Sequence, residues 1–79
     1  MTTNEILKRV IDLFAAMADT DDEITEESEL IEDLGISSMD VLFLISSLEE
    51  EFGIKISEKE VRKMATIGDV TEVIEGLIK

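Results

Sequence analysis

The chain has 79 residues and a formal net charge of −13, because 20 acidic side chains face only 7 lysines and arginines. This charge repels nucleic acid and anionic membranes, and it attracts partners with basic surfaces. The chain has no cysteine, so it can form neither a disulfide nor a thiolate metal site. It also has no histidine, so a serine nucleophile would lack an imidazole base, and we expect a non-enzyme.

The first predicted element is an amphipathic helix over about residues 3 to 18. Thr2 and Glu5 have the spacing of a capping box, in which each side chain bonds the other residue's backbone amide. The apolar stripe of this helix is expected to face the core. Its members are Ile6, Leu7, Val10, Ile11, Phe14 and Met17.

An acidic connection follows over residues 19 to 37, with a short helical turn expected at about residues 30 to 33. A loop of this length needs apolar anchors or a function of its own. The expected anchors are Ile24, Leu30, Ile31, Leu34 and Ile36.

The same connection invites a calcium interpretation, since oxygen-bearing side chains from Asp21 onward fall at the offsets of an EF-hand loop. However, Glu26 stands where that loop needs a glycine for its sharp turn. We therefore expect no specific metal site.

The second helix is predicted over about residues 38 to 51, opened by the capping-box pair Ser37 and Asp40. Met39 and Phe43 fall on the face opposite the core, where an exposed apolar pair would serve as a docking spot for a partner. The alternative is that Phe43 folds back against the long loop. The core face comprises Val41, Leu44, Ile45, Leu48 and Phe52.

Two further helices complete the chain. Gly53 is expected to end the second helix as a C-cap glycine. The pair Ser57 and Glu60 opens a short third helix to about residue 64, and the pair Thr66 and Asp69 opens a last helix to about residue 77. The expected core stripe of the last helix is Ile67, Val70, Val73, Ile74 and Leu77. The basic patch on the third helix is Lys59, Arg62 and Lys63.

These elements predict an all-α fold: a small four-helix bundle with three main helices, a short third helix and a long first loop. We expect one domain over residues 1–79, and a monomer. No apolar run reaches membrane-spanning length and the start lacks a signal-peptide pattern, so a cytoplasmic location is expected.

Ser38 lies in the first turn of the second helix, beside backbone amides that have no partner within the helix. Free amides and the helix dipole both favour an anion there, so the position suits a phosphate-bearing group. From the local sequence alone, Ser38 is either an ordinary neighbour of a cap or a site of covalent modification.

The run Asp33-Leu34-Gly35, followed after two residues by Ser38, Met39 and Asp40, closely resembles the attachment motif of acyl carrier proteins. The resemblance continues through residues 48 to 52 and covers most of the chain. It implies that Ser38 carries 4′-phosphopantetheine, installed from coenzyme A by a phosphopantetheinyl transferase with magnesium. It also implies that the chain delivers acyl thioesters to fatty-acid or polyketide biosynthetic enzymes.

The resemblance further implies which residues contact partner enzymes. The sequence departs from the usual family pattern at four positions: Ser37 replaces aspartate, Met39 replaces leucine, Phe43 replaces a recognition glutamate, and Arg62 reverses a charge on the third helix. We therefore hypothesise a specialised carrier, recognised partly through Met39 and Phe43. The expected partner-binding residues are Met39, Asp40, Leu42, Phe43, Glu49, Glu50 and Glu58.

Other functions remain open at this point. The carrier could serve an aminoacyl or peptidyl system, and the chain could instead be an acidic helical interaction module without a prosthetic group. A calcium sensor is a third alternative, and a catalytic role is the most remote.

Overall fold

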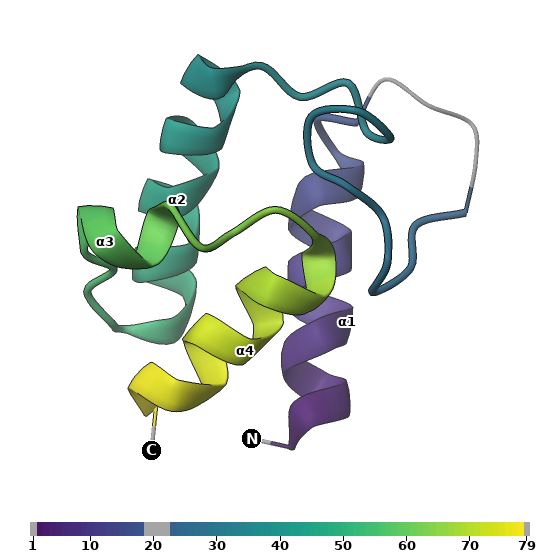
Figure 1. The fold of residues 1–79 in the computed structure, drawn as a ribbon. Coiled ribbons are helices and arrows are strands. Elements are labelled where there is room, and N and C mark those ends of the chain that lie inside the picture. The colour runs from purple at the N-terminus through teal and green to yellow at the C-terminus, as the bar shows by residue number, and fades with distance from the viewer. Residues whose placement is uncertain (1, 19–22, 79) are drawn as a thin grey trace.

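A computed structural model describes residues 2–18 and 23–78 and confirms the predicted all-α bundle (Figure 1). The helices of the described part are α1 (Thr3–Ala15), α2 (Ser38–Phe52), α3 (Glu58–Val61) and α4 (Ile67–Ile78). Helix α1 packs most extensively against α4 and less against α2. Asp21, where the calcium-loop pattern begins, lies outside the described residues.

All helices begin where the sequence predicts, because hydroxyl side chains cap them. The Thr2–Glu5 capping box is complete, and the bond from the Thr2 amide holds the pKa of Glu5 below its ordinary value. At α4, the Asp69 amide donates to the Thr66 hydroxyl at 3.2 Å and the Thr66 amide donates back to the Asp69 carboxylate at 3.1 Å. Such caps satisfy amides that have no acceptor within the helix.

Two helices end earlier than predicted. Helix α1 stops at Ala15 rather than near residue 18, and α3 stops at Val61 rather than near residue 64. In both places the next amides bond to the carbonyl three residues back: Met17 to Phe14, and Met64 to Val61, each at 3.1 Å. This tighter pattern closes the last turn of a helix and leads the chain out of it.

The core is formed by the predicted stripes, with corrections. Ile31, expected as a loop anchor, is 61% exposed, and Leu77, expected in the stripe of α4, is 37% exposed at the end of that helix. Helix α3 contributes no buried residue. The buried apolar residues are Ile6, Val10, Phe14, Leu30, Leu34, Ile36, Leu44, Ile45, Leu48, Ile56, Met64, Ile67, Val70 and Ile74.

The long connection is fastened to the start of α4 by backbone hydrogen bonds. The Leu30 amide donates to the Ala65 carbonyl at 3.0 Å, and the Gly68 amide donates to the Glu26 carbonyl at 2.8 Å. Residues 30 to 33, where a short helical turn was expected, form a single turn, in which the Asp33 amide donates to the Glu29 carbonyl at 3.0 Å. No helix in the described part of the chain is long and apolar enough to cross a bilayer.

Candidate functional site

Two neighbouring serines at the start of α2 differ in their hydrogen bonds. Ser37 is the N-cap, and its hydroxyl accepts the Asp40 amide at 3.2 Å. Ser38 is the first residue of the helix and is exposed, and its hydroxyl makes no hydrogen bond within residues 2–18 and 23–78. Because Ser37 performs the capping, the hydroxyl of Ser38 is available for chemistry.

A glycine turn presents this pair of serines. Gly35 adopts a φ of 67°, in the left-handed region, between the buried residues Leu34 and Ile36. A side chain would be strained in this conformation. The turn lets both neighbours reach the core, and it brings Ser37 into position to cap α2.

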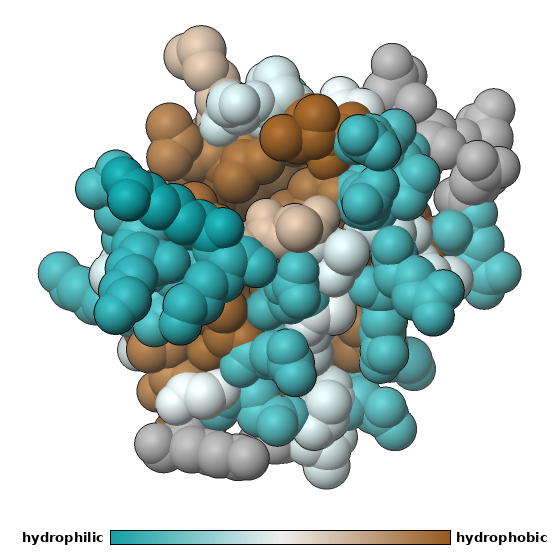
Figure 2. Space-filling model, viewed as in Figure 1, coloured by the Kyte–Doolittle hydropathy of each residue, from teal (hydrophilic) through white to brown (hydrophobic). Residues whose placement is uncertain are grey.

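An apolar hollow of about 520 Å³ lies beside Ser38. Figure 2 shows apolar surface around a hollow in the upper half of the view, with hydrophilic surface on either side. The hollow is formed by three segments: the long connection, the start of α2, and the end of α3 with the residues after it. Its lining residues are Glu29, Leu30, Ile31, Glu32, Ser38, Val41, Leu42, Val61, Met64 and Ala65.

The surroundings of Ser38 fit an acylated phosphopantetheine group. The amides of Ser38 and Met39 belong to the first turn of α2, where a helix offers them no internal acceptor, and such amides favour a phosphate. The adjacent hollow offers apolar surface to an apolar chain. Within the described ranges, no group of three acidic side chains is arranged to hold a metal ion.

The predicted apolar contact residues are all at the surface. Met39 is 81% exposed, Leu42 63% and Phe43 65%. Phe43 therefore does not fold back against the long loop, and that alternative is wrong. Leu42 also lines the hollow, so the exposed apolar surface of α2 continues into it.

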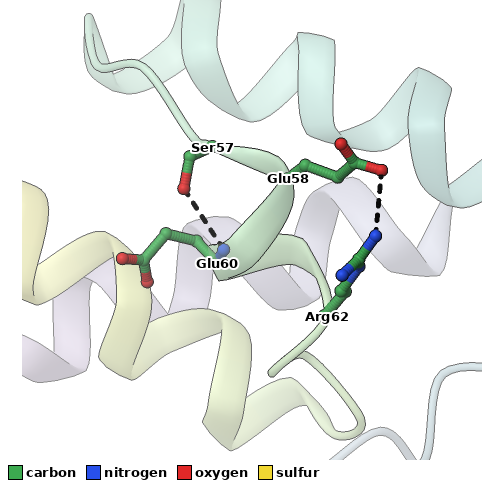
Figure 3. Close-up of polar contacts among 4 residues, drawn as sticks. All are labelled: Ser57, Glu58, Glu60 and Arg62. Carbon is green, nitrogen blue, oxygen red and sulfur yellow. Dashed lines mark hydrogen bonds and ion pairs between the residues drawn. The ribbon is translucent and has the colours of Figure 1, made fainter.

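The predicted acidic contact residues differ in their surroundings. Asp40 is half-buried near the start of α2, and Glu50 is exposed. Glu58 is exposed and forms an ion pair with Arg62 on the next turn, at 3.4 Å (Figure 3). An exposed pair of this kind contributes little to stability.

Glu49 is the exception among the acidic residues. It is half-buried, and its Oε2 accepts the Ile56 amide at 2.7 Å. No sequence pattern predicted this contact or the hollow. The only sequence signal for the hollow was the small apolar face of the third helix, formed by Val61 and Met64.

Comparisons with known proteins agree with this geometry. A family model described as "Phosphopantetheine attachment site" matches residues 8–74. An acyl carrier protein from Wolinella succinogenes is 50% identical over 54 residues, which cover 68% of this chain and 71% of the relative. An acyl carrier protein from Thermotoga maritima is 36% identical over 72 residues, which cover 90% of this chain and 89% of the relative.

Solved structures show the same fold. A Mycobacterium tuberculosis protein, described as a candidate acyl carrier protein, superposes with a TM-score of 0.82 at 31% identity, covering 90% of this chain and 96% of the other. The acyl carrier protein of Enterococcus faecalis superposes with a TM-score of 0.81 at 29% identity, covering 98% and 99%.

Proposed function

The chain belongs to the acyl carrier protein family, whose members carry a covalently attached 4′-phosphopantetheine, and we propose that Ser38 is the attachment residue. The observation that carries this proposal is the pair of serines at the start of α2. Ser37 is engaged as the cap, whereas Ser38 presents an exposed hydroxyl at the edge of the hollow. The attached group supplies a thiol that holds acyl intermediates as thioesters.

The chain's own residues have three tasks in this function. The Ser38 oxygen would hold the group through an ester bond to its phosphate, formed as the adenosine bisphosphate part of coenzyme A leaves, and the first amides of α2 would favour the phosphate's negative charge. Val41, Leu42 and Val61 offer apolar surface to the acyl chain. Burial of apolar surface there is favourable by about 25 cal/mol per Å².

We further propose that the cargo is an aliphatic acyl group and that the chain serves fatty-acid or polyketide enzymes. The apolar lining of the hollow supports this, since an aminoacyl cargo would bring a charged amine into it and lose hydration. The chain itself is proposed to be a non-enzyme. Its partners are a phosphopantetheinyl transferase and biosynthetic enzymes, which the net charge of −13 predicts to have basic docking surfaces.

The experiment is loading by a broad-specificity phosphopantetheinyl transferase with coenzyme A and magnesium, followed by intact-mass and peptide mass spectrometry. Wild type is expected to gain one phosphopantetheine group on Ser38, and Ser38→Ala none. Ser37→Ala is the matched control, because it removes the neighbouring hydroxyl and should still be loaded. Absence of an adduct in wild type, or an adduct on another residue, would overturn the proposal.

A further inference from the structure

One carboxylate of α2 is used inside the fold rather than on its surface. Glu49 Oε2 accepts the Ile56 amide at 2.7 Å, and the Glu49 carbonyl accepts the Ile54 amide at 3.1 Å. Its neighbours Glu50 and Glu51 are exposed, whereas Glu49 is half-buried. A single residue of α2 thus holds the connection to α3 at two points, and the side-chain bond is of the strong, charge-assisted kind.

This connection leads into one wall of the hollow beside Ser38. The wall consists of Val61, Met64 and Ala65. At its far end, the Ala65 carbonyl is bonded to the Leu30 amide. At its near end, the Glu49–Ile56 bond is the fastening.

Between these two ends the wall is weakly held. Helix α3 has one turn and contains no fully buried residue; the partly buried Val61 and the apolar neighbours Ile56 and Met64 anchor it in the core. Segments with few buried contacts open locally at low free-energy cost. Loss of the near fastening would therefore free α3 to move while the end at Ala65 stays in place.

We propose that Glu49 is a clasp, a positioning residue whose carboxylate sets how readily α3 moves away from α2 and opens the hollow. The carboxylate is occupied by the Ile56 amide in the closed form, which separates its role from that of a docking residue such as Glu50. The link to cargo release rests on the proposed function, whereas the clasp is a property of the fold and can be tested without the attached group.

The test is amide hydrogen exchange on the unloaded protein, comparing wild type, Glu49→Ala and Glu50→Ala. In Glu49→Ala, the Ile56 amide and the amides of residues 58 to 64 should exchange roughly tenfold faster or more, since a hydrogen bond to a charged group is lost. Amides of α1 and α4 should keep their wild-type rates. Glu50→Ala, which removes the adjacent exposed carboxylate, should leave all of these rates unchanged.

A second measurement reports on the hollow itself. The uncharged dye Nile red should fluoresce more strongly with Glu49→Ala than with wild type, and Glu49→Gln, which keeps an acceptor oxygen, should lie between them. Equal exchange at Ile56 in the Glu49 and Glu50 variants, or faster exchange throughout Glu49→Ala, would overturn the clasp. The clasp is tested on the unloaded protein and the proposed function by loading of wild type, so failure of the clasp and failure of the proposed function are distinguishable.

Discussion

Glu29 and Glu32 lie one turn apart at the edge of the hollow. The pKa of Glu29 is raised above its ordinary value of 4.5, first by a hydrogen bond with the Glu32 side chain and then by the charge of Glu32. A hydrogen bond between two carboxyl groups needs a proton, so the folded protein binds that proton more tightly than the unfolded chain does. Its contribution to stability is therefore full below pH 4.5 and is lost as pH rises through the raised pKa of Glu29.

At neutral pH the two carboxylates repel each other, and this predicts the effect of Glu32→Gln. The variant should unfold at a higher urea concentration than wild type at pH 7, and the difference should narrow at pH 4. Glu27→Gln is the matched control, because it removes the same charge from the same connection at an exposed position. If both variants raised the midpoint equally, the gain would come from net charge and not from the pair.

At the scale of the element, α4 contains two glycines with opposite surroundings. A Cβ added at Gly76 would meet nothing within 4 Å, whereas a Cβ at Gly68 would lie 3.1 Å from the Glu26 carbonyl oxygen. That oxygen accepts the Gly68 amide at 2.8 Å, so it cannot retreat without stretching the bond that fastens the long connection to α4. A side chain at position 68 would therefore make a closer contact with this carbonyl than side chains usually make.

The two alanine variants should consequently change stability in opposite directions. Gly76→Ala should raise the free energy of unfolding by about 0.5–1 kcal/mol, because alanine is the better helix former. Gly68→Ala should lower it, since the same propensity gain is outweighed by the displaced carbonyl. Urea denaturation followed by circular dichroism measures both, and a stabilised Gly68→Ala would contradict the role given to this contact.

The helices also show how far the sequence specifies this fold. Starts were predictable because a cap is a contact between residues three apart, such as Ser57 and Glu60 (Figure 3). The ends of α1 and α3 were not predictable from the sequence, because a helix end depends on where the chain must turn toward other elements. The predicted burial of Ile31 was wrong for a related reason, because the spacing of loop residues does not show which side of the loop faces the core.

In the candidate site, too, features set by local sequence were predictable, and features set by contacts between elements were not. Exposure of Met39 and Phe43 follows from helical periodicity, so it was predictable. The hollow and the Glu49–Ile56 bond depend on how α2, α3 and the long connection meet, and the small apolar face formed by Val61 and Met64 did not specify that arrangement. The spacing of Ser37 and Asp40 predicted that Ser37 caps the helix, which the structure confirms, and the resemblance pointed to Ser38.

At the scale of the molecule, charge and apolar surface are separated. No lysine or arginine lies between residues 10 and 54, so that whole span is acidic. One of the few bases, Arg9 of α1, is paired with Glu51 of α2. This negative charge is expected to attract basic partners over a long range, whereas the exposed apolar side chains of Met39, Leu42 and Phe43 would interact only on contact. Docking on α2 is thus expected to combine fast, salt-dependent association with a short-range apolar contact.

This division gives a test of the specialised-carrier hypothesis, with Phe43→Glu as the variant. The change removes an exposed apolar group and adds a charge that a basic enzyme surface would attract, so loaded Phe43→Glu should transfer acyl groups to fatty-acid synthase enzymes several-fold faster than loaded wild type. The gain should shrink with added salt, because the screening length falls from about 10 Å at 0.1 M to about 3 Å at 1 M.

Asn4→Glu adds the same charge on α1, away from Ser38, and should give no comparable gain. Equal gains in both variants would assign the effect to net charge, and no gain in Phe43→Glu would contradict the hypothesis.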